Sequence, residues 1–218
     1  MYKNRIRDFF NGNYGRQERY WWKNDNRYSI SEDDHTPYYA AILKEAKAIG
    51  KGRVLDLGAG EGADSIRLAK LGFLVDSVEM SPVGADKIRN YAKEAGCDIN
   101  VICDDIENFI PNHKYEIVMC NGVLHYVKNK LNVVSMMKEV TKLGGINCIS
   151  LFSDYTEIPK CHQIVPVFPD SEGGIIEQSY EDWDNLFLKY DREKPEQSHD
   201  GMEPHIHSYI KRIWRKTT

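Results

Sequence analysis

The sequence of 218 residues contains no apolar run that reaches the roughly 18 residues required for a membrane-spanning helix. At its start, charged residues stand where a secretory signal peptide has its apolar stretch. The cysteines are odd in number, five, and none belongs to a CxxC pair, which argues against a disulfide framework and a cysteine-based zinc site. These absences predict a cytoplasmic protein with reduced cysteines.

The chain also lacks the basic excess of a nucleic-acid binding protein, because its formal net charge is −4. We therefore expect neither a nucleic-acid nor a membrane partner, and a monomer or a homodimer. Residues 1–28 differ, with 7 Lys and Arg against 3 Asp and Glu. We interpret residues 1–35 as a basic aromatic arm. It either packs on the domain that follows or covers a ligand as a lid, through Tyr20, Trp21, Trp22, Tyr28 and His35.

From residue 36 onward, strand and helix patterns alternate. Short strands are expected at residues 53–57, 74–79, 99–103, 115–120 and 146–152, and helices at residues 37–49, 63–71, 82–95 and 131–140. Thr36 and Ser81 are expected to cap helices, and Gly144-Gly145 to end the last of them. An irregular insertion at residues 154–182 precedes two further strands at residues 185–190 and 205–214, which no helix separates.

This order predicts one α/β domain over residues 36–218. Its sheet is expected to be doubly wound, seven-stranded, mostly parallel and Rossmann-like, and to end in an antiparallel hairpin. In such a sheet, ligands bind outside the carboxyl ends of the parallel strands.

A glycine-rich turn joins the first strand to its helix. Its sequence from Gly58 to Ala63, GAGEGA, fits the pattern G-x-G-x-x-[G/A], and Glu79 follows 21 residues after the first glycine. Glycines let the backbone approach a ligand closely, while a carboxylate at the end of the next strand can accept two hydrogen bonds from a ribose diol. Both NAD and S-adenosylmethionine (SAM) carry such a ribose, so the turn alone leaves both open.

Three features favour SAM over NAD. Asp56 lies two residues before the first glycine, the third strand ends in Asp104-Asp105, and the chain finishes in a hairpin without a separate substrate domain. A SAM site needs a carboxylate near the ammonium group of the methionine moiety and an acceptor for the adenine amino group. These acids supply both, and a dehydrogenase needs neither.

Four segments resemble the class I SAM-dependent methyltransferases: VLDLGAGEG at 54–62, DSVEMS at 76–81, CDDIENF at 103–109 and YEIVMCNGVLHYV at 115–127. The resemblance covers residues 36–152, and residues 52–82 are most similar to the small tellurite-resistance-type branch. It implies an enzyme that transfers the methyl group of SAM. By position, it assigns the methionine end of SAM to Asp56, Gly58, Ala59 and Gly60, the ribose to Glu79, the adenine to Met80, Asp105 and Ile106, and the reacting centre to Asn121.

The methyl acceptor is expected where histidines gather near the strand ends. These are His125, His162, His199, His205 and His207. His205 and His207 alternate along a strand and so share one face. One reading makes His205, or less favourably His125, the base that takes the acceptor's proton, and another makes His199, His205 and His207 metal ligands. In a third interpretation, these histidines only form hydrogen bonds within a polar hairpin. On their spacing alone we assign no metal.

The acceptor itself is expected to be a small molecule or a short peptide that presents a thiol, a chalcogen oxyanion, an amine or a hydroxyl. Two other functions remain open at this point. The domain can be a SAM-binding module without catalysis, which docks a peptide or protein partner through its basic arm, or a small NAD-dependent oxidoreductase.

Overall fold

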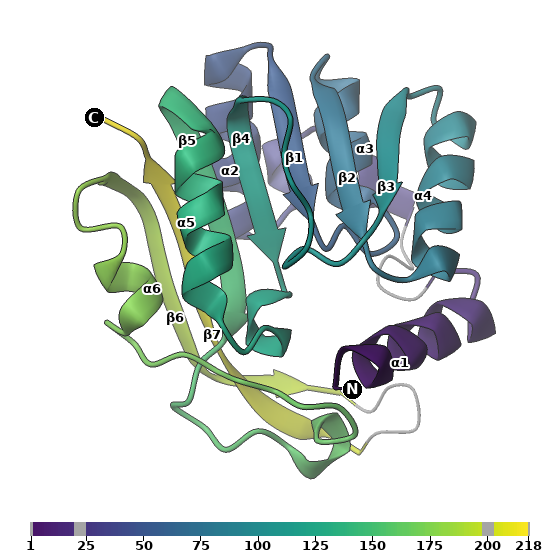
Figure 1. The fold of residues 1–218 in the computed structure, drawn as a ribbon, viewed down its shortest axis with the longest axis vertical. Coiled ribbons are helices and arrows are strands. Elements are labelled where there is room, and N and C mark those ends of the chain that lie inside the picture. Colours follow the sequence, from purple (N-terminus) through teal and green to yellow (C-terminus); the bar gives the residue numbers. More distant parts are fainter. Residues whose placement is uncertain (1, 20–24, 198–202, 218) are drawn as a thin grey trace.

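One seven-stranded sheet organises the chain (Figure 1), and the computed structural model describes residues 2–19, 25–197 and 203–217. The order of the strands is β3-β2-β1-β4-β5-β7-β6. Their bounds are β1 Arg53–Leu57, β2 Leu74–Glu79, β3 Ile99–Cys103, β4 Tyr115–Asn121, β5 Thr141–Phe152, β6 Asp184–Glu196 and β7 His205–Arg215. Strands β1 to β5 pair in parallel, whereas β7 is antiparallel to both β5 and β6. The predicted fold class is confirmed.

Helices cover both faces of this sheet. Those on the faces are α2 Pro37–Ile49, α3 Ala63–Lys70, α4 Pro82–Glu94, α5 Lys130–Val140 and the short α6 Ile175–Gln178, whereas α1 Tyr2–Arg16 lies at the carboxyl ends of the strands. Side chains of α5 and α6 pack with Leu55, Leu57 and Val118 on one face. Those of α2 and α3 pack with Val54 and Ile117 on the other. Neighbouring strand residues thus point to opposite layers, as the pleat of a strand requires.

Of the two expected helix caps, one is present. The Ser81 hydroxyl accepts a hydrogen bond from the backbone N–H of Gly84 at 3.0 Å, and the helix begins at Pro82, as expected for a capped start. Helix α2 begins at Pro37 as predicted, but the side chain of Thr36 makes no capping hydrogen bond. The expected cap at Thr36 is therefore wrong in its chemistry, although the boundary is right.

The start of β5 is a second correction. Gly144-Gly145 was expected to separate helix from strand, yet β5 begins at Thr141 and includes both glycines. The pairing with β4 shifts register between Tyr115 and Ile117, and Gly144 has a φ of 77°. The glycines therefore lie in an irregularity of the ladder, which is a position that suits glycine inside a strand.

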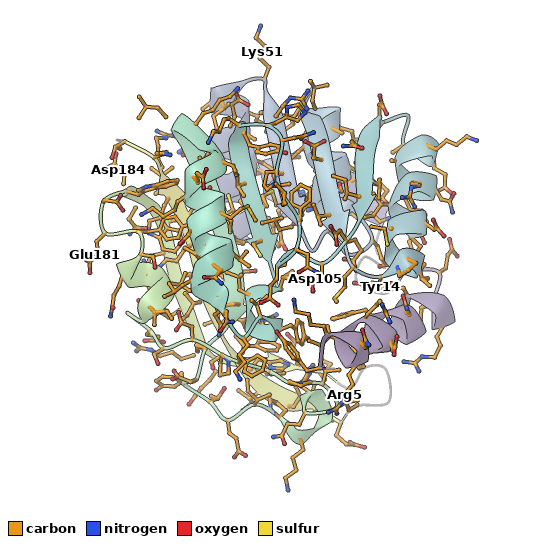
Figure 2. All side chains as sticks on the ribbon, in the orientation of Figure 1. Arg5, Tyr14, Lys51, Asp105, Glu181 and Asp184 are labelled. Atoms are coloured by element: carbon orange, nitrogen blue, oxygen red, sulfur yellow. The ribbon has the colours of Figure 1, made fainter. Side chains whose placement is uncertain are left out.

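The N-terminal arm contains a helix that sequence analysis did not identify. Helix α1 lies across the carboxyl ends of the strands and contacts α4 (Figure 1). Its Ile6 and Tyr14 are buried. Figure 2 shows Tyr14 near Asp105 at this end of the sheet and Lys51 at the opposite end. The predicted lid residues Tyr20, Trp21 and Trp22 lie outside the described residues, so their role stays a prediction.

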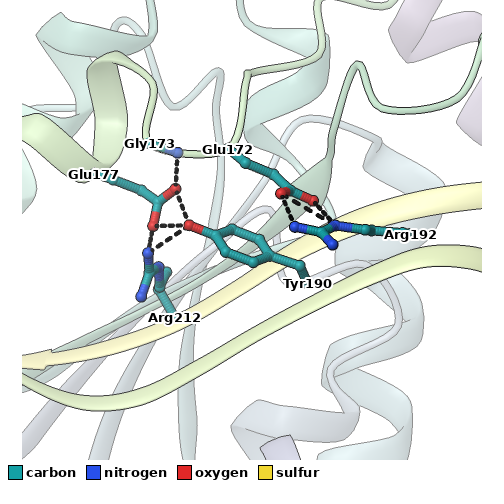
Figure 3. Close-up of polar contacts among 6 residues, drawn as sticks. All are labelled: Glu172, Gly173, Glu177, Tyr190, Arg192 and Arg212. Carbon is teal, nitrogen blue, oxygen red and sulfur yellow. Dashed lines mark hydrogen bonds and ion pairs between the residues drawn. The ribbon is translucent and has the colours of Figure 1, made fainter.

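The insertion after β5 contains little regular structure beyond α6 and a 3₁₀ turn at Lys160–His162. Two ion pairs fasten it to the hairpin of β6 and β7, Glu177 with Arg212 and Glu172 with Arg192 (Figure 3). The Tyr190 hydroxyl also donates to Glu177, at 3.0 Å, and accepts from Arg212 at 2.9 Å. The hairpin thus holds the insertion beside the strand ends.

The hairpin itself is longer than predicted. Its strands pair up to Glu196 and His205, whereas the pairing of β7 with β5 ends at Tyr209 and Phe152. The end of the hairpin therefore extends past the sheet, on the side where α1 lies (Figure 1). Among the described residues, no helix combines the length and apolarity that a membrane crossing demands.

Candidate active site at the carboxyl ends of the strands

A cavity of about 470 Å³ opens at the carboxyl ends of the strands. All nine residues that the sequence assigns to the cofactor line it: Asp56, Gly58, Ala59, Gly60, Glu79, Met80, Asp105, Ile106 and Asn121. Its volume lies within the range typical of small-molecule sites. The chain order also reverses here, since β2 and β3 lie on one side of β1 and β4 on the other. Ligands of α/β sheets bind at this kind of switch point.

The glycine turn is held tightly against its neighbours. The backbone N–H groups of Gly58 and Ala59 both donate to the carbonyl of Val78, at 2.8 and 3.0 Å. Gly58 has a φ of 71°, and a Cβ there would lie 2.3 Å from a methyl group of Val123. Only glycine satisfies both constraints, and its bare backbone forms part of the cavity wall.

Asp56 lies near the end of β1, and its buried side chain contacts α3. Its carboxylate accepts a hydrogen bond from the Ser65 hydroxyl at 2.6 Å, and Ser65 lies 2.7 Å from the hydroxyl of Ser77. Burial, and next the charge of the nearby Asp64, raise the pKa of Asp56. A cationic ligand in the cavity would favour the ionised form of this carboxyl group.

Glu79 ends β2 with a carboxylate that two backbone groups hold in place. One oxygen accepts from the N–H of Gly60 at 2.9 Å, and the other accepts from the N–H of Ser81 at 2.8 Å. Burial raises the pKa of Glu79 to about 7 despite these donors. Each carboxylate oxygen has a further lone pair for a ligand hydroxyl.

The contribution of Glu79 to folding stability is expected to fall as the pH rises from about 4.5 to about 7. The unfolded chain ionises this group near 4.5, whereas the folded protein keeps the proton up to about 7, so the folded state binds more protons in this window. The contribution is fully present below pH 4.5 and lost above pH 7. Urea unfolding at pH 5 and pH 7.5 measures it.

The comparison with Glu79→Gln isolates this effect, because glutamine does not titrate. The loss of stability between the two pH values should be smaller in the variant by on the order of 1 to 3 kcal/mol. Acids whose pKa values are lowered in the folded protein, such as Glu116 and Asp191, make stability rise with pH instead. Parent and variant share these acids, so their contribution cancels in the comparison. Equal pH dependence in both proteins would show that Glu79 is ionised in the folded state at all these pH values.

Helix α1 closes the expected adenine end of the cavity. Lys3 forms ion pairs with Asp105 at 2.7 Å and with Glu107 at 2.9 Å. Ile6, Phe10 and Tyr14 of the same helix line the cavity. The aromatic arm was considered as a cover for a ligand, but neither its helix nor Ile6 was identified from the sequence. The spacing of four residues between Ile6, Phe10 and Tyr14 is the signal that could have revealed the helix, because it places the three side chains on one helix face.

Asn121 is fixed between two helices at the end of β4. Its side-chain carbonyl accepts from the Tyr38 hydroxyl of α2 at 2.7 Å, and its amide donates to Asp64 of α3 at 3.2 Å. These bonds fix the orientation of a side chain that lines the cavity. Asp64 lines the cavity too.

His125 lines the cavity, and its hydrogen bonding leaves Nε2 as a donor. Its Nδ1 accepts the backbone N–H of Phe152 at 3.2 Å, so the neutral ring carries its proton on Nε2. Burial, and next the charges of His162 and His207, lower the pKa of His125 well below its usual value. A neutral ring of this tautomer offers no lone pair on Nε2, which disfavours the base role considered for His125.

The remaining histidines form a cluster where the insertion meets the hairpin. Nε2 of His205 lies 2.9 Å from Nε2 of His207 and 3.2 Å from Nε2 of His162. His162 and His207 line the cavity, whereas His205 is not among the lining residues. Burial, and next the charges of His162 and His205, lower the pKa of His207 to about 3. His199, the third ligand in the expected metal set, lies outside the described residues.

Comparison with known proteins identifies the family. The model of the family described as tellurite resistance protein TehB matches residues 20–203, which is most of the chain. A crystal structure of TehB from Haemophilus influenzae has a TM-score of 0.70 with this structure, at 21% identity, over 84% of this chain and 64% of that chain. This likeness concerns the fold.

Two curated relatives extend the comparison. A probable SAM-dependent methyltransferase TehB of Haemophilus influenzae is 25% identical over 181 residues, which are 82% of this chain and 59% of the relative. A ubiquinone biosynthesis O-methyltransferase of Rickettsia canadensis is 28% identical over 134 residues, which are 60% of this chain and 57% of the relative. The chain thus spans just over half the length of these relatives. On the family match, the chain belongs to the TehB family, the tellurite-resistance branch of the class I SAM-dependent methyltransferases that its motifs resemble.

Proposed function

We propose that this chain transfers a methyl group from SAM to a small acceptor. The proposal rests on one observation above all. The glycine turn and three carboxylates from the ends of successive strands, Asp56, Glu79 and Asp105, border the same cavity. A nucleoside that carries an amino acid offers a matching set of groups: an ammonium, a ribose diol and an adenine amino group.

Each part of SAM then has a partner. Asp56 and the glycine turn hold the methionine end, and Glu79 accepts hydrogen bonds from the ribose hydroxyls. Met80 and Ile106 pack against the adenine ring, while Asp105 accepts from its amino group. Asp105 already pairs with Lys3 of α1, so the same carboxylate links the cofactor to the helix that covers it. Helix α1 is in this proposal the lid of the cofactor site.

The chemistry needs positioning more than acid or base groups. A lone pair of the acceptor forms a bond to the methyl carbon while the carbon–sulfur bond breaks, and its electron pair stays on sulfur. The sulfonium leaves as a neutral thioether, so the protein has mainly to hold nucleophile, methyl carbon and sulfur in line. Asn121 lines the cavity, and in this proposal it borders the reacting centre.

The acceptor end is the part of the cavity between the strand tips and the hairpin. Phe152, His207 and Tyr209 line it, with Lys211 at its edge. The rings of Phe152 and His207 are stacked with centroids 4.7 Å apart, so aromatic side chains form part of this wall. His125 also lines the cavity, and in this proposal its N–H is one of the donors to an acceptor oxygen. Because α1 and the insertion enclose this space, we infer a small molecule as acceptor rather than a protein.

A turnover assay tests the proposal. The purified chain is incubated with labelled SAM and a panel of thiols, hydroxyl compounds, amines and chalcogen oxyanions, and S-adenosylhomocysteine is measured. We expect its formation with at least one class of acceptor, and slower formation in Glu79→Ala at SAM concentrations near the Kd of the parent. If SAM binds but no acceptor is methylated across the panel, the chain is a SAM-binding module. If only NAD binds, the proposal is wrong.

A further inference from the structure

Three imidazoles converge at the acceptor end from two separate segments. His162 belongs to the 3₁₀ turn of the insertion, and His205 and His207 lie on one face of β7, beyond the last pairing with β5. One ring nitrogen from each lies within 4.8 Å of the others. Figure 1 shows the insertion beside the free end of the hairpin. The fold thus brings together side chains that are more than 40 residues apart in sequence.

The central imidazole has a fixed tautomer. Nδ1 of His205 lies 2.7 Å from the backbone carbonyl of Glu203, which can only accept a hydrogen bond. Nδ1 therefore carries the proton, and in the neutral ring Nε2 presents a lone pair toward His162 and His207. Metal-binding histidines are oriented in the same way, since their second nitrogen commonly donates to a carbonyl or carboxylate.

The spacing of the three nitrogens suits a metal ion. Nitrogens bound to tetrahedral zinc at about 2.0–2.1 Å are separated from one another by about 3.3 Å. The distances from His205 Nε2 to its two neighbours, 2.9 and 3.2 Å, are close to this value. The third spacing, between the ligand nitrogens of His162 and His207, is within 4.8 Å.

The cluster also has an open side. His162 and His207 line the cavity, so a cation among the three nitrogens would have its next coordination position toward the acceptor. Three protein ligands with one open position are typical of catalytic zinc sites, whereas structural sites are closed by four. Among the described residues, no other group of His, Cys, Asp and Glu has this arrangement.

We propose that His162, His205 and His207 bind a divalent cation of the zinc class, and that its open position receives the oxygen or sulfur atom of a hydroxyl or thiol acceptor. The coordination of the acceptor, unlike the binding of the cation, rests on the proposed methyl transfer. Coordination would make the acceptor lose its proton to solvent water, because a bound cation lowers the pKa of its ligand. The remaining lone pair would then form the bond to the methyl carbon, without a histidine base.

Metal binding is tested without reference to activity. The full chain, prepared without a polyhistidine tag and stripped with a chelator, is titrated with Zn²⁺ by calorimetry and with Co²⁺ by visible absorption. We expect one equivalent of either ion, and for Co²⁺ the intense bands of a four-coordinate site. His162→Ala should weaken binding by at least about tenfold, as should His207→Ala. His113→Ala is the matched control, since His113 is exposed and outside the cluster.

His162 is the safer variant, because its side chain belongs to the insertion and not to the sheet. Thermal melting checks that each variant folds, and Zn²⁺ should raise the melting temperature of the parent and of His113→Ala but not of His162→Ala. Absence of Zn²⁺ and Co²⁺ binding, or equal binding in all variants, would overturn the site and leave a hydrogen-bonded imidazole cluster. SAM titrations of the stripped protein test the cofactor proposal separately, because its residues are not in the cluster.

Discussion

Replacing Glu79 by alanine is expected to weaken SAM binding by about 1.5 to 3 kcal/mol, or roughly 10- to 150-fold in Kd. The carboxylate is buried, and the backbone N–H groups of Gly60 and Ser81 hold both of its oxygens in place. In our proposal it accepts hydrogen bonds from the two ribose hydroxyls, and a charged acceptor makes such bonds stronger than neutral ones. Calorimetric titration with SAM at pH 8, where the group is ionised, gives the Kd.

Two further variants serve as an intermediate case and a control. Glu79→Gln keeps the shape of the side chain but places an amide where a carboxylate accepted hydrogen bonds, so it should also weaken binding, though less than alanine. Glu116→Gln removes an acid on β4 that pairs with Lys142, outside the residues that line the cavity, and should bind SAM as the parent does. Unchanged affinity in Glu79→Ala, with a parent-like melting curve, would mean that the ribose is held elsewhere.

Glu177→Ala is expected to have the largest effect on stability, about 3 kcal/mol. Its partner Arg212 is 8% exposed and would lose its counter-ion while staying buried. Leaving a buried charge unpaired costs about 3 to 5 kcal/mol, and the bond that Arg212 keeps to the Tyr190 hydroxyl favours the lower end. Urea unfolding of parent and variant measures the difference.

The second ion pair in Figure 3 is the matched control for this prediction. Glu172 pairs with Arg192 at 2.9 Å and joins the same insertion to the same hairpin, but the side chain of Arg192 is exposed to solvent. Exposed pairs contribute little because water already screens both charges. Glu172→Ala should therefore unfold at the same urea concentration as the parent. Equal destabilisation by both substitutions would contradict the argument from burial.

The parallel half of the sheet could be predicted because local signals there agree with one another. Residues 53–57, for example, form an apolar run before a glycine turn, and the structure has β1 at Arg53–Leu57. Pro82 after Ser81 likewise marks the start of α4 at the correct residue. The cavity-lining positions follow from these elements, since a parallel sheet places the ends of β1, β2 and β4 together.

Two other parts of the site depend on packing between distant segments. Helix α1 has few local helix signals, and it is held by contacts such as the bond from the Ser81 hydroxyl to Asn11 at 2.6 Å. The position of His162 depends on how the insertion returns to the hairpin, which no periodicity encodes. From the sequence, His162 could be placed among the histidines near the strand ends, and His205 and His207 could be paired by their alternation. The metal set expected with them contained His199, whereas the structure brings His162 to them.

The central claim is that the cavity at the strand ends holds the nucleoside of SAM. A crystal structure of the chain with S-adenosylhomocysteine tests it most directly. Our account predicts both ribose hydroxyls within hydrogen-bond distance of the Glu79 carboxylate, with the adenine ring beneath α1 and beside Ile106. A ligand bound elsewhere on the surface, or a ribose turned away from Glu79 in this cavity, would contradict it.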